Sequence, residues 1–325
     1  MSKRRSTAIS LFLGVILICC SLVGNQNSYS MNQSRKEQVA AFVERLYIEC
    51  LDRSSDPKGL EDWSDLLLRG DLTGAQALSG FILSYEYSSK HVSDEMYVEM
   101  LYRTCLNRES DMEGKNDWCT VLQQGCSRDY VLKGFVNSVE FNQLCKSYGI
   151  QSGDIALTQA RDVYPTYTAQ VSDLYRSVLQ RDADVDGLNN YVNMLAHGQI
   201  TISEIKLQLL QSKEFDLKHA ENEDYIKSVY EICRNSDIDE NELNFYIYYI
   251  DHSGSRSDIC QLLNSSYYSY VMNLYQTAFQ RVPDRAELYQ WMYSIVHDNM
   301  TGAKIVYSFV FSSFKILFLF NINFN

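Results

Sequence analysis

Apolar residues recur at helical spacing along most of the chain, in short segments that polar turns separate. The first such helical face consists of Val43, Leu46, Tyr47, Cys50 and Leu51. The 325 residues are 46% hydrophobic and include only three prolines, the residue that breaks helices. The pattern therefore predicts an all-α protein built from amphipathic helices.

Five segments of this pattern begin alike, which indicates an internal repeat. They read LYIECLDRSSDPKGLEDW from Leu46, LYRTCLNRESDMEGKNDW from Leu101, LYRSVLQRDADVDGLNNY from Leu174, VYEICRNSDIDENELNFY from Val229 and LYQTAFQRVPDRAELYQW from Leu274. Each segment continues into a second and a third amphipathic stretch. We predict a tandem array of about five three-helix units, each of roughly 45 to 50 residues, a length common among helical repeats.

Residue types at fixed distances from the shared tyrosine define the repeat. An Arg follows after six residues except at Ser236, an Asp after nine, and an aromatic residue after sixteen. A Gly follows after twelve residues in the first three copies. These columns are Tyr47, Arg53, Asp56, Gly59 and Trp63; Tyr102, Arg108, Asp111, Gly114 and Trp118; and Tyr175, Arg181, Asp184, Gly187 and Tyr191. We interpret them as structural positions.

Each column has an expected structural role. The Asp is expected to be the N-cap of the second helix, with Pro57 at the first helical position of the first copy. The Arg is expected to pair with that Asp or to cap the carbonyls at the end of the first helix. The third helix is expected to start at a hydroxyl residue, namely Thr73, Ser127, Thr201, Ser257 and Thr301.

The copies divide the chain into segments. We assign a signal peptide at residues 1–24, helical unit 1 at 38–90, unit 2 at 93–148, a linker at 149–167, unit 3 at 168–218, unit 4 at 221–266 and a divergent unit 5 at 267–318. The linker contains GIQSGDIALTQARDVYPTY and accounts for the longest interval between the shared tyrosines. The apolar stretch from Ile305 is interpreted as a divergent third helix plus a tail.

The N-terminus has the features of an export segment. The basic start MSKRR precedes an apolar run from Ala8 to Val23, as in a cleaved signal peptide. An uncleaved membrane anchor and a lipoprotein site at Cys20 are the alternatives. The apolar run is shorter than the roughly 20 residues that span a bilayer, which favours cleavage. We therefore expect a secreted or cell-surface protein that meets the membrane only through this segment.

The net charge argues against nucleic acid as a partner. Loss of Lys3, Arg4 and Arg5 with the export segment takes the net charge from −12 to −15, whereas a protein that binds nucleic acid needs a cationic surface.

Seven cysteines remain after the export segment is removed, which is an odd number. Cys50, Cys105 and Cys233 share one apolar repeat position and are expected in the core, whereas a disulfide among Cys119, Cys126 and Cys145 is left open.

One segment resembles a metal loop. Asp182, Asp184, Asp186 and Gly187 match the start of an EF-hand calcium loop, and Asp237 and Asp239 come close to it in the fourth copy. The closing Glu is absent, because Asn193 occupies that position. The alternative, which we favour, is a polar turn that leads into an N-cap. Calcium is the one cofactor that this pattern suggests.

The repeat resembles a known family. The string LYxxxLxRxxDxxGLxxW, followed by GFILSYEY from Gly80 and GFVNSVEF from Gly134, is similar to the bacterial domain of unknown function 4214, and the first three copies carry it best. Glu242 and Glu287 replace the Gly in the last two copies. The resemblance, which extends to the phycobilisome linker domain, implies a binding or scaffolding module at the cell exterior and no catalytic residues.

The function expected from these patterns is non-enzymatic binding. Tandem units build extended surfaces, for which cell-envelope glycan or an extracellular protein is the expected partner. A self-associating linker or scaffold of a surface assembly is the second hypothesis, and the oligomeric state is left open. A helical hydrolase acting on an extracellular polymer is the third. The sequence contains no HExxH, GxSxG, phosphate-loop or dinucleotide motif.

Overall fold

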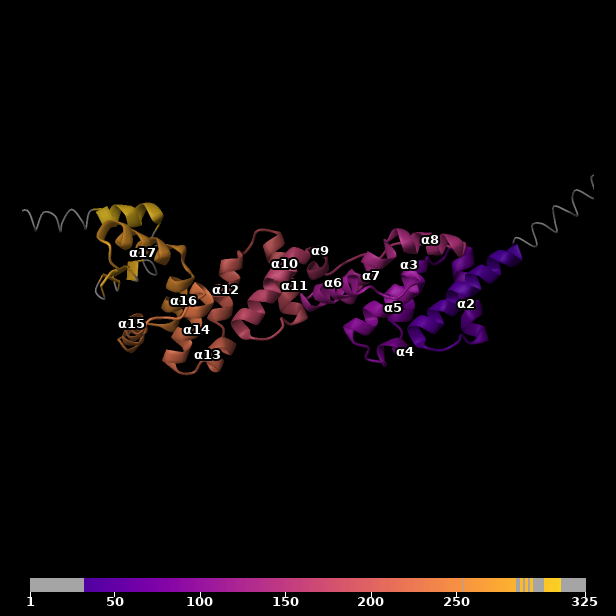
Figure 1. Ribbon diagram of the computed structural model, residues 1–325, viewed down its shortest axis with the longest axis horizontal. Helices are drawn as coiled ribbons and strands as arrows, with labels where there is room; N and C mark the ends of the chain where they lie inside the picture. The colour runs from indigo at the N-terminus through magenta and orange to yellow at the C-terminus, as the bar shows by residue number, and fades with distance from the viewer. Residues whose placement is uncertain are drawn as a thin grey trace, which may run out of the picture. The chain divides into compact units, whose positions relative to one another are not determined.

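Helices form all of the regular structure that the computed structural model describes (Figure 1), which confirms the all-α prediction. The described residues are 32–252, 254–284, 287–288, 290–291, 293–294 and 301–310. The expected signal peptide lies outside them. The chain divides into two compact halves, the first ending at Val163 and the second starting at Tyr164.

The N-terminal half holds the first two units. Its elements are a first helix at residues 32–51, α2 (Pro57–Arg69), α3 (Gly74–Ile82), α4 (Tyr85–Ser88), α5 (Asp94–Leu106), α6 (Met112–Gln123), α7 (Arg128–Val136), α8 (Val139–Ser147) and α9 (Ala160–Val163). Both units contribute to one hydrophobic core, which runs from Val39 on the first helix to Ile150 after α8. Each unit thus buries its apolar face partly against its neighbour, as in other helical repeats.

The C-terminal half holds the remaining three units. Its elements are α10 (Pro165–Leu174), the π-helical turn η1 (Tyr175–Leu179), α11 (Val185–Ala196), α12 (Ile202–Leu210), α13 (Lys213–Lys218), α14 (Asn222–Arg234), α15 (Glu240–Asp251), α16 (Arg256–Asn264), α17 (Ser266–Phe279) and a helix at 302–310. The last of these packs Ile305 and Phe309 against Tyr275 and Trp291 of the fifth unit. The apolar stretch therefore begins as a helix of that unit, while residues 311–325 lie outside the described part.

A short fourth helix completes each of the first three units, beyond the three that the pattern predicts. The recurring Ser of the segments GFILSYEY, GFVNSVEF and QLLQSKEF is its N-cap: Ser84, Ser138 and Ser212 accept hydrogen bonds from the amides three residues later. In the fourth unit the equivalent Ser265 caps α17 instead, and α17 is also the first helix of the fifth unit.

The helix starts follow the predicted caps with one exception. The Asp column is the N-cap of the second helix in the first four units, and Asp284 accepts from the Glu287 amide at 3.0 Å in the fifth. Thr73 and Thr201 form the expected capping boxes, and Ser127 and Thr301 also cap. The prediction for Ser257 was wrong: Ser255 is the cap and pairs with Asp258, because α16 starts two residues earlier.

All five first helices end at a residue in the left-handed backbone conformation that is not glycine. These residues are Asp52, Asn107, Gln180, Asn235 and Gln280, with φ between 53° and 55°. Each lies five residues after the shared tyrosine, immediately before the Arg column. A left-handed residue stops a helix and turns the chain sharply, so it directs the following Arg back toward the helix that it leaves.

Residues 149–163, within the expected linker, are fixed to the N-terminal half. The carbonyl oxygens of Gln151 and Ser152 accept the first two amides of α3, at 2.7 and 2.8 Å. Asp162 is buried and accepts from both the amide and the hydroxyl of Ser127, each at 2.7 Å. The segment thus satisfies helix-start amides of both units.

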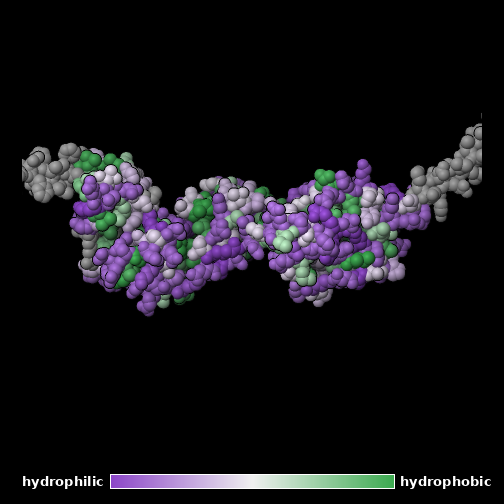
Figure 2. All heavy atoms as spheres, in the orientation of Figure 1, coloured by the Kyte–Doolittle hydropathy of each residue, from purple (hydrophilic) through white to green (hydrophobic). Residues whose placement is uncertain are grey.

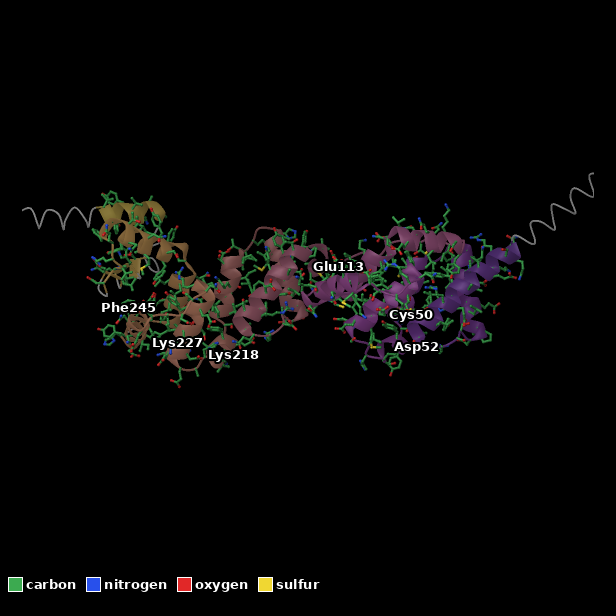
Figure 3. All side chains as sticks on the ribbon, in the orientation of Figure 1. Cys50, Asp52, Glu113, Lys218, Lys227 and Phe245 are labelled. Carbon is green, nitrogen blue, oxygen red and sulfur yellow. The ribbon has the colours of Figure 1, made fainter. Side chains whose placement is uncertain are left out.

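The seven described cysteines are all free thiols, so no disulfide links Cys119, Cys126 and Cys145 in the structure. Cys50 and Cys105 are buried, as predicted for core positions, whereas Cys233 is half-buried. Figure 3 shows Cys50 near the end of the first helix, close to Asp52. Burial raises the pKa of Cys50 and of Cys145 to about 12, which leaves them protonated at neutral pH.

Hydrophilic residues dominate the face shown in Figure 2, and a hydrophobic patch covers helix 302–310. Val306, Tyr307 and Val310 of this helix are exposed. In the described part of the chain, no helix combines the length and the apolar character needed to cross a membrane.

Replacement of Gly134 by Ala is expected to lower the free energy of unfolding by about 1 to 3 kcal/mol, because a Cβ there would overlap the Trp118 ring. Thermal or urea denaturation measures the change. Gly302→Ala is the matched control, since nothing lies within 4 Å of its Cβ position. Equal effects of the two substitutions would contradict this packing.

Native thiols are expected to react slowly with an aromatic disulfide reagent, because burial keeps most of them protonated and inaccessible. Denaturant should expose all seven of the described cysteines at once. The reagent's absorbance counts them before and after unfolding. In a chain without residues 1–24, which include Cys19 and Cys20, fewer than seven titratable thiols after unfolding would reveal a disulfide.

Candidate functional site

The repeat columns meet at one place in every unit, where the first helix ends and the second begins. We call the residues of the Tyr, Arg, Asp and Gly columns the corner. In the second unit, Asp111 accepts the Gly114 amide at 2.8 Å. A Cβ at Gly114 would overlap the Tyr102 hydroxyl, so this position admits only glycine while the tyrosine lies over the start of α6. The same overlap occurs at Gly59 and Gly187.

The Arg column closes the corner by stacking on its tyrosine. The guanidinium carbon lies 4.8, 5.0, 5.2 and 5.3 Å from the tyrosine ring centroid in units 1, 2, 3 and 5. Its main partner is the Glu of the short fourth helix: Arg53 binds Glu86 and Arg181 binds Glu214 through two nitrogens each. The predicted pairing with the Asp column occurs for Arg108 and Asp111, at 3.4 Å.

The aromatic column packs on the third helix. A Cβ at Gly80 would lie 2.7 Å from the Trp63 ring, and Gly134 admits Trp118 in the same way. In the third unit Tyr191 replaces Trp and Gln208 replaces the Gly, and the Tyr191 hydroxyl donates to the Gln208 amide oxygen at 3.0 Å. The aromatic position and the position that it contacts on the third helix are thus replaced together in the third unit.

The pKa of the capping carboxyl reflects the same geometry. The hydrogen bond from the Gly59 amide lowers the pKa of Asp56, and the bond from Gly114 lowers that of Asp111. Glu86 and Glu214 also have lowered pKa values, each because of its arginine. Burial raises the pKa of the three tyrosines Tyr47, Tyr102 and Tyr175. These groups are thus held in the charge state that binds their neighbours.

The fourth unit rebuilds the corner around Glu242, which stands where the first three units have Gly. Its carboxylate accepts the hydroxyl of Tyr230 at 3.1 Å and that of Tyr246 at 3.0 Å, and Tyr268 donates to it as well. Ser236 replaces the Arg, and Tyr267 replaces the Glu that the Arg would bind. Both members of that ion pair are therefore lost together.

The fifth unit keeps the Arg, and its carboxylate partner is Glu287, which stands where the first three units have Gly. Arg281 binds Glu287 through two nitrogens, at 2.7 and 2.8 Å. This ion pair lowers the pKa of Glu287. Trp291 donates its indole N–H to the Tyr275 hydroxyl at 3.1 Å. A glutamate on the second helix thus replaces the glutamate of the short fourth helix.

The candidate calcium residues are not brought together. Asp182 pairs with Arg176 at 2.8 Å, and Asp184 is used as the N-cap of α11, whose first turn contains Asp186. Asp239 accepts two amides at the start of α15, and Asp237 is exposed in the turn before it. Across the described ranges, no three or more His, Cys, Asp and Glu side chains are grouped as metal ligands would be. These contacts are those of a polar turn and its N-cap.

A hollow of about 620 Å³ lies between the fourth and fifth units. The start of α15 lines one side, and α17 with the turn that follows it lines the other. The described lining residues are Asp239, Asn241, Glu242, Asn244, Phe245, Met272, Val282, Pro283 and Leu288. Ligand pockets have volumes of roughly 300 to 1,000 Å³ and combine an apolar lining with a few polar groups, so this hollow has the size and the composition of one.

Three apolar residues of this hollow occupy repeat positions that are polar in every earlier unit, a signal that the sequence interpretation missed. Phe245 stands where units 1, 2 and 3 have Asp62, Asp117 and Asn190. Val282 stands where units 1 to 4 have Ser54, Glu109, Asp182 and Asp237, and Met272 where they have Glu44, Glu99, Ser172 and Lys227. Comparison of the copies position by position would have located the hollow.

In the first two units one of these polar positions joins the first helix to the turn by a hydrogen bond. Glu44 accepts the Ser55 amide at 3.1 Å, and Glu99 accepts that of Ser110 at 3.1 Å. The bond from the Ser110 hydroxyl lowers the pKa of Glu99 to about 2. In the fifth unit the two positions are Met272 and Pro283, and proline has no amide to donate. An apolar wall thus replaces a hydrogen bond.

A second hollow, of about 400 Å³, lies in the N-terminal half and is lined in part by Asp94, Ser127 and Arg128. Its polar groups are engaged within the chain. Arg128 binds Asp94 at 2.7 Å and stacks over Tyr97, and Ser127 binds Asp162. The hollow between the fourth and fifth units is therefore the stronger candidate site.

Arg181→Met is expected to reduce the free energy of unfolding by about 0.2 to 1 kcal/mol near neutral pH, because it removes an exposed ion pair with Glu214. The folded-state pKa of Glu214 lies below its ordinary value of 4.5. The contribution is therefore complete above that pH and is lost as the pH falls through the folded-state value.

Denaturant unfolding of the unmodified chain and of Arg181→Met at about pH 7 and about pH 3 tests this. The difference between their free energies of unfolding should be smaller at the lower pH. Arg69→Met, which removes an arginine from an exposed pair with Asp71 outside the corner, is the matched control. A difference that persists unchanged in acid would contradict the ion pair's contribution.

Comparison with known proteins assigns the repeat to a family. The model of a domain of unknown function, DUF4214, matches residues 25–91, 79–145 and 164–219, which correspond to the first three units. These matches cover more than half of the chain. No curated protein matches the chain. The chain is a member of the DUF4214 family, with three matched copies of its domain.

Proposed function

We propose that this chain is an exported, non-enzymatic binding protein of the cell exterior, whose partner is cell-envelope glycan or an extracellular protein. The basic and apolar start of the sequence supports export. The strongly acidic composition disfavours nucleic acid and anionic lipid as partners.

The observation that carries the proposal is that the side chains of the repeat bind one another. The tyrosine, arginine and aspartate of each complete corner, together with the glutamate of the short fourth helix, are engaged in stacking, capping and ion pairing. The residues of the family signature therefore hold the fold together, and we assign binding to the surface positions that differ between copies. This distribution is usual in repeat proteins that bind other molecules.

The surface of the N-terminal half offers apolar contact area for a protein partner. Tyr85 is 88% exposed and Val139 is 71% exposed, and each is the first residue of a short fourth helix. Leu83 and Met112 are also largely exposed. Exposed apolar side chains of this size favour protein contacts. They also favour the second candidate function, self-association of the chain as a scaffold.

Binding is tested with the purified full chain on a glycan array and by sedimentation with isolated bacterial cell wall. We expect retention by at least one glycan class or by the wall fraction, and Tyr85→Ser with Val139→Ser should leave glycan binding intact. Absence of binding in both assays, together with no protein captured from an extracellular fraction, would overturn the proposal.

Self-association is tested by light scattering over a concentration series. A scaffold would increase in mass with concentration, and Tyr85→Ser with Val139→Ser would reduce that increase. A constant monomer mass at all concentrations would exclude the scaffold and leave the binding proposal in place.

A further inference from the structure

We infer that the hollow between the fourth and fifth units binds a saccharide that carries no negative charge. This inference rests on the proposed function, since it names a ligand class and the place where that ligand binds. The side chains of the hollow are supplied by α15, by α17 and by the turn after α17. Figure 3 labels Phe245 on α15.

The apolar wall suits the C–H face of a sugar ring. Of the hollow's lining residues, Phe245 and Leu288 are buried, Met272 is half-buried, and Val282 is 59% exposed. At each of the three positions Phe245, Met272 and Val282, the other four copies carry a polar residue. Burial of apolar surface against a ring face contributes roughly 25 cal/mol per Å².

The start of α15 supplies hydrogen-bonding groups to the same hollow. Asn241 and Asn244 are exposed on the first turns of α15. An amide side chain offers two N–H donors and a carbonyl acceptor, which matches a sugar hydroxyl because that group both donates and accepts. A hollow that combines apolar side chains with amide groups is thus complementary to both the C–H face and the hydroxyls of a saccharide.

The charges of the hollow select against anionic sugars. Asp239 and Glu242 line it, so an anionic sugar would meet two carboxylates. Asp239 already accepts two backbone amides and Glu242 already accepts three tyrosine hydroxyls, so these hydrogen bonds hold both carboxylates in place. The preferred ligand therefore carries hydroxyl or acetamido groups and no negative charge.

Titration calorimetry of the full chain with four disaccharides tests this inference. The uncharged pair is cellobiose and di-N-acetylchitobiose, and the charged pair is a glucuronate-containing disaccharide and the disaccharide of glucosamine. At least one uncharged disaccharide should bind, and the glucuronate-containing one should bind at least tenfold more weakly than it. Preferential binding of the glucuronate-containing disaccharide would overturn the inference.

Two variants locate the site. Val282→Asp introduces the residue that units 3 and 4 carry at this exposed position, and it should weaken saccharide binding at least tenfold. Asn244→Ala should weaken binding severalfold. Asn189→Ala, at the equivalent position of the third unit, is the matched control and should leave binding unchanged. Thermal melts of all three should match that of the unmodified chain.

The outcomes separate this inference from the proposed function. Glycan binding that survives both Val282→Asp and Asn244→Ala would overturn the hollow as the site while the proposed function stands. Cell-wall retention without binding of any of the four disaccharides would also overturn it. If the glycan array, the cell-wall assay and the calorimetry all show no binding, both the inference about the hollow and the proposed glycan binding are overturned.

Discussion

The contact of a tyrosine ring with the first turn of the following helix is the constraint on which each unit depends. The ring reaches that turn only because the residue beneath its hydroxyl is Gly59, Gly114 or Gly187, or, in the last two units, a glutamate that binds near it. The negative face of the ring attracts the guanidinium stacked over it, and the Asp cap starts the second helix beside it. One small region thus joins the two helices.

The departures from this arrangement occur in the C-terminal units, where the candidate site lies. Loss of the Arg at Ser236 leaves Glu242 to gather three tyrosine hydroxyls, and replacement of the turn's polar residues by Val282 and Pro283 forms an apolar wall. A repeat keeps its fold if each copy retains some form of the corner, so other positions can diverge. The proposed binding site therefore lies in the copies that differ most.

The sequence predicted three helices of each unit, the order of the units and the Asp caps, because these follow from local periodicity and capping chemistry, but not the short fourth helices α4, α8 and α13. It did not predict that Arg53 binds Glu86, since that pair is 33 residues apart and depends on how the short helix folds back. The left-handed ends at Asp52 and Gln180 carried no glycine to indicate them. The hollow was not predicted, because it forms between two units and its apolar residues Phe245, Met272 and Val282 lie outside the columns that the copies share.

The central claim is that the corner stabilises both helices that it joins. Hydrogen exchange of the full chain with Tyr102→Leu, compared with the unmodified chain, tests it most directly. We expect α5 and α6 to lose protection together while the helices of the C-terminal half keep theirs. Unchanged protection of α6, or a loss confined to the turn around residue 102, would contradict the claim.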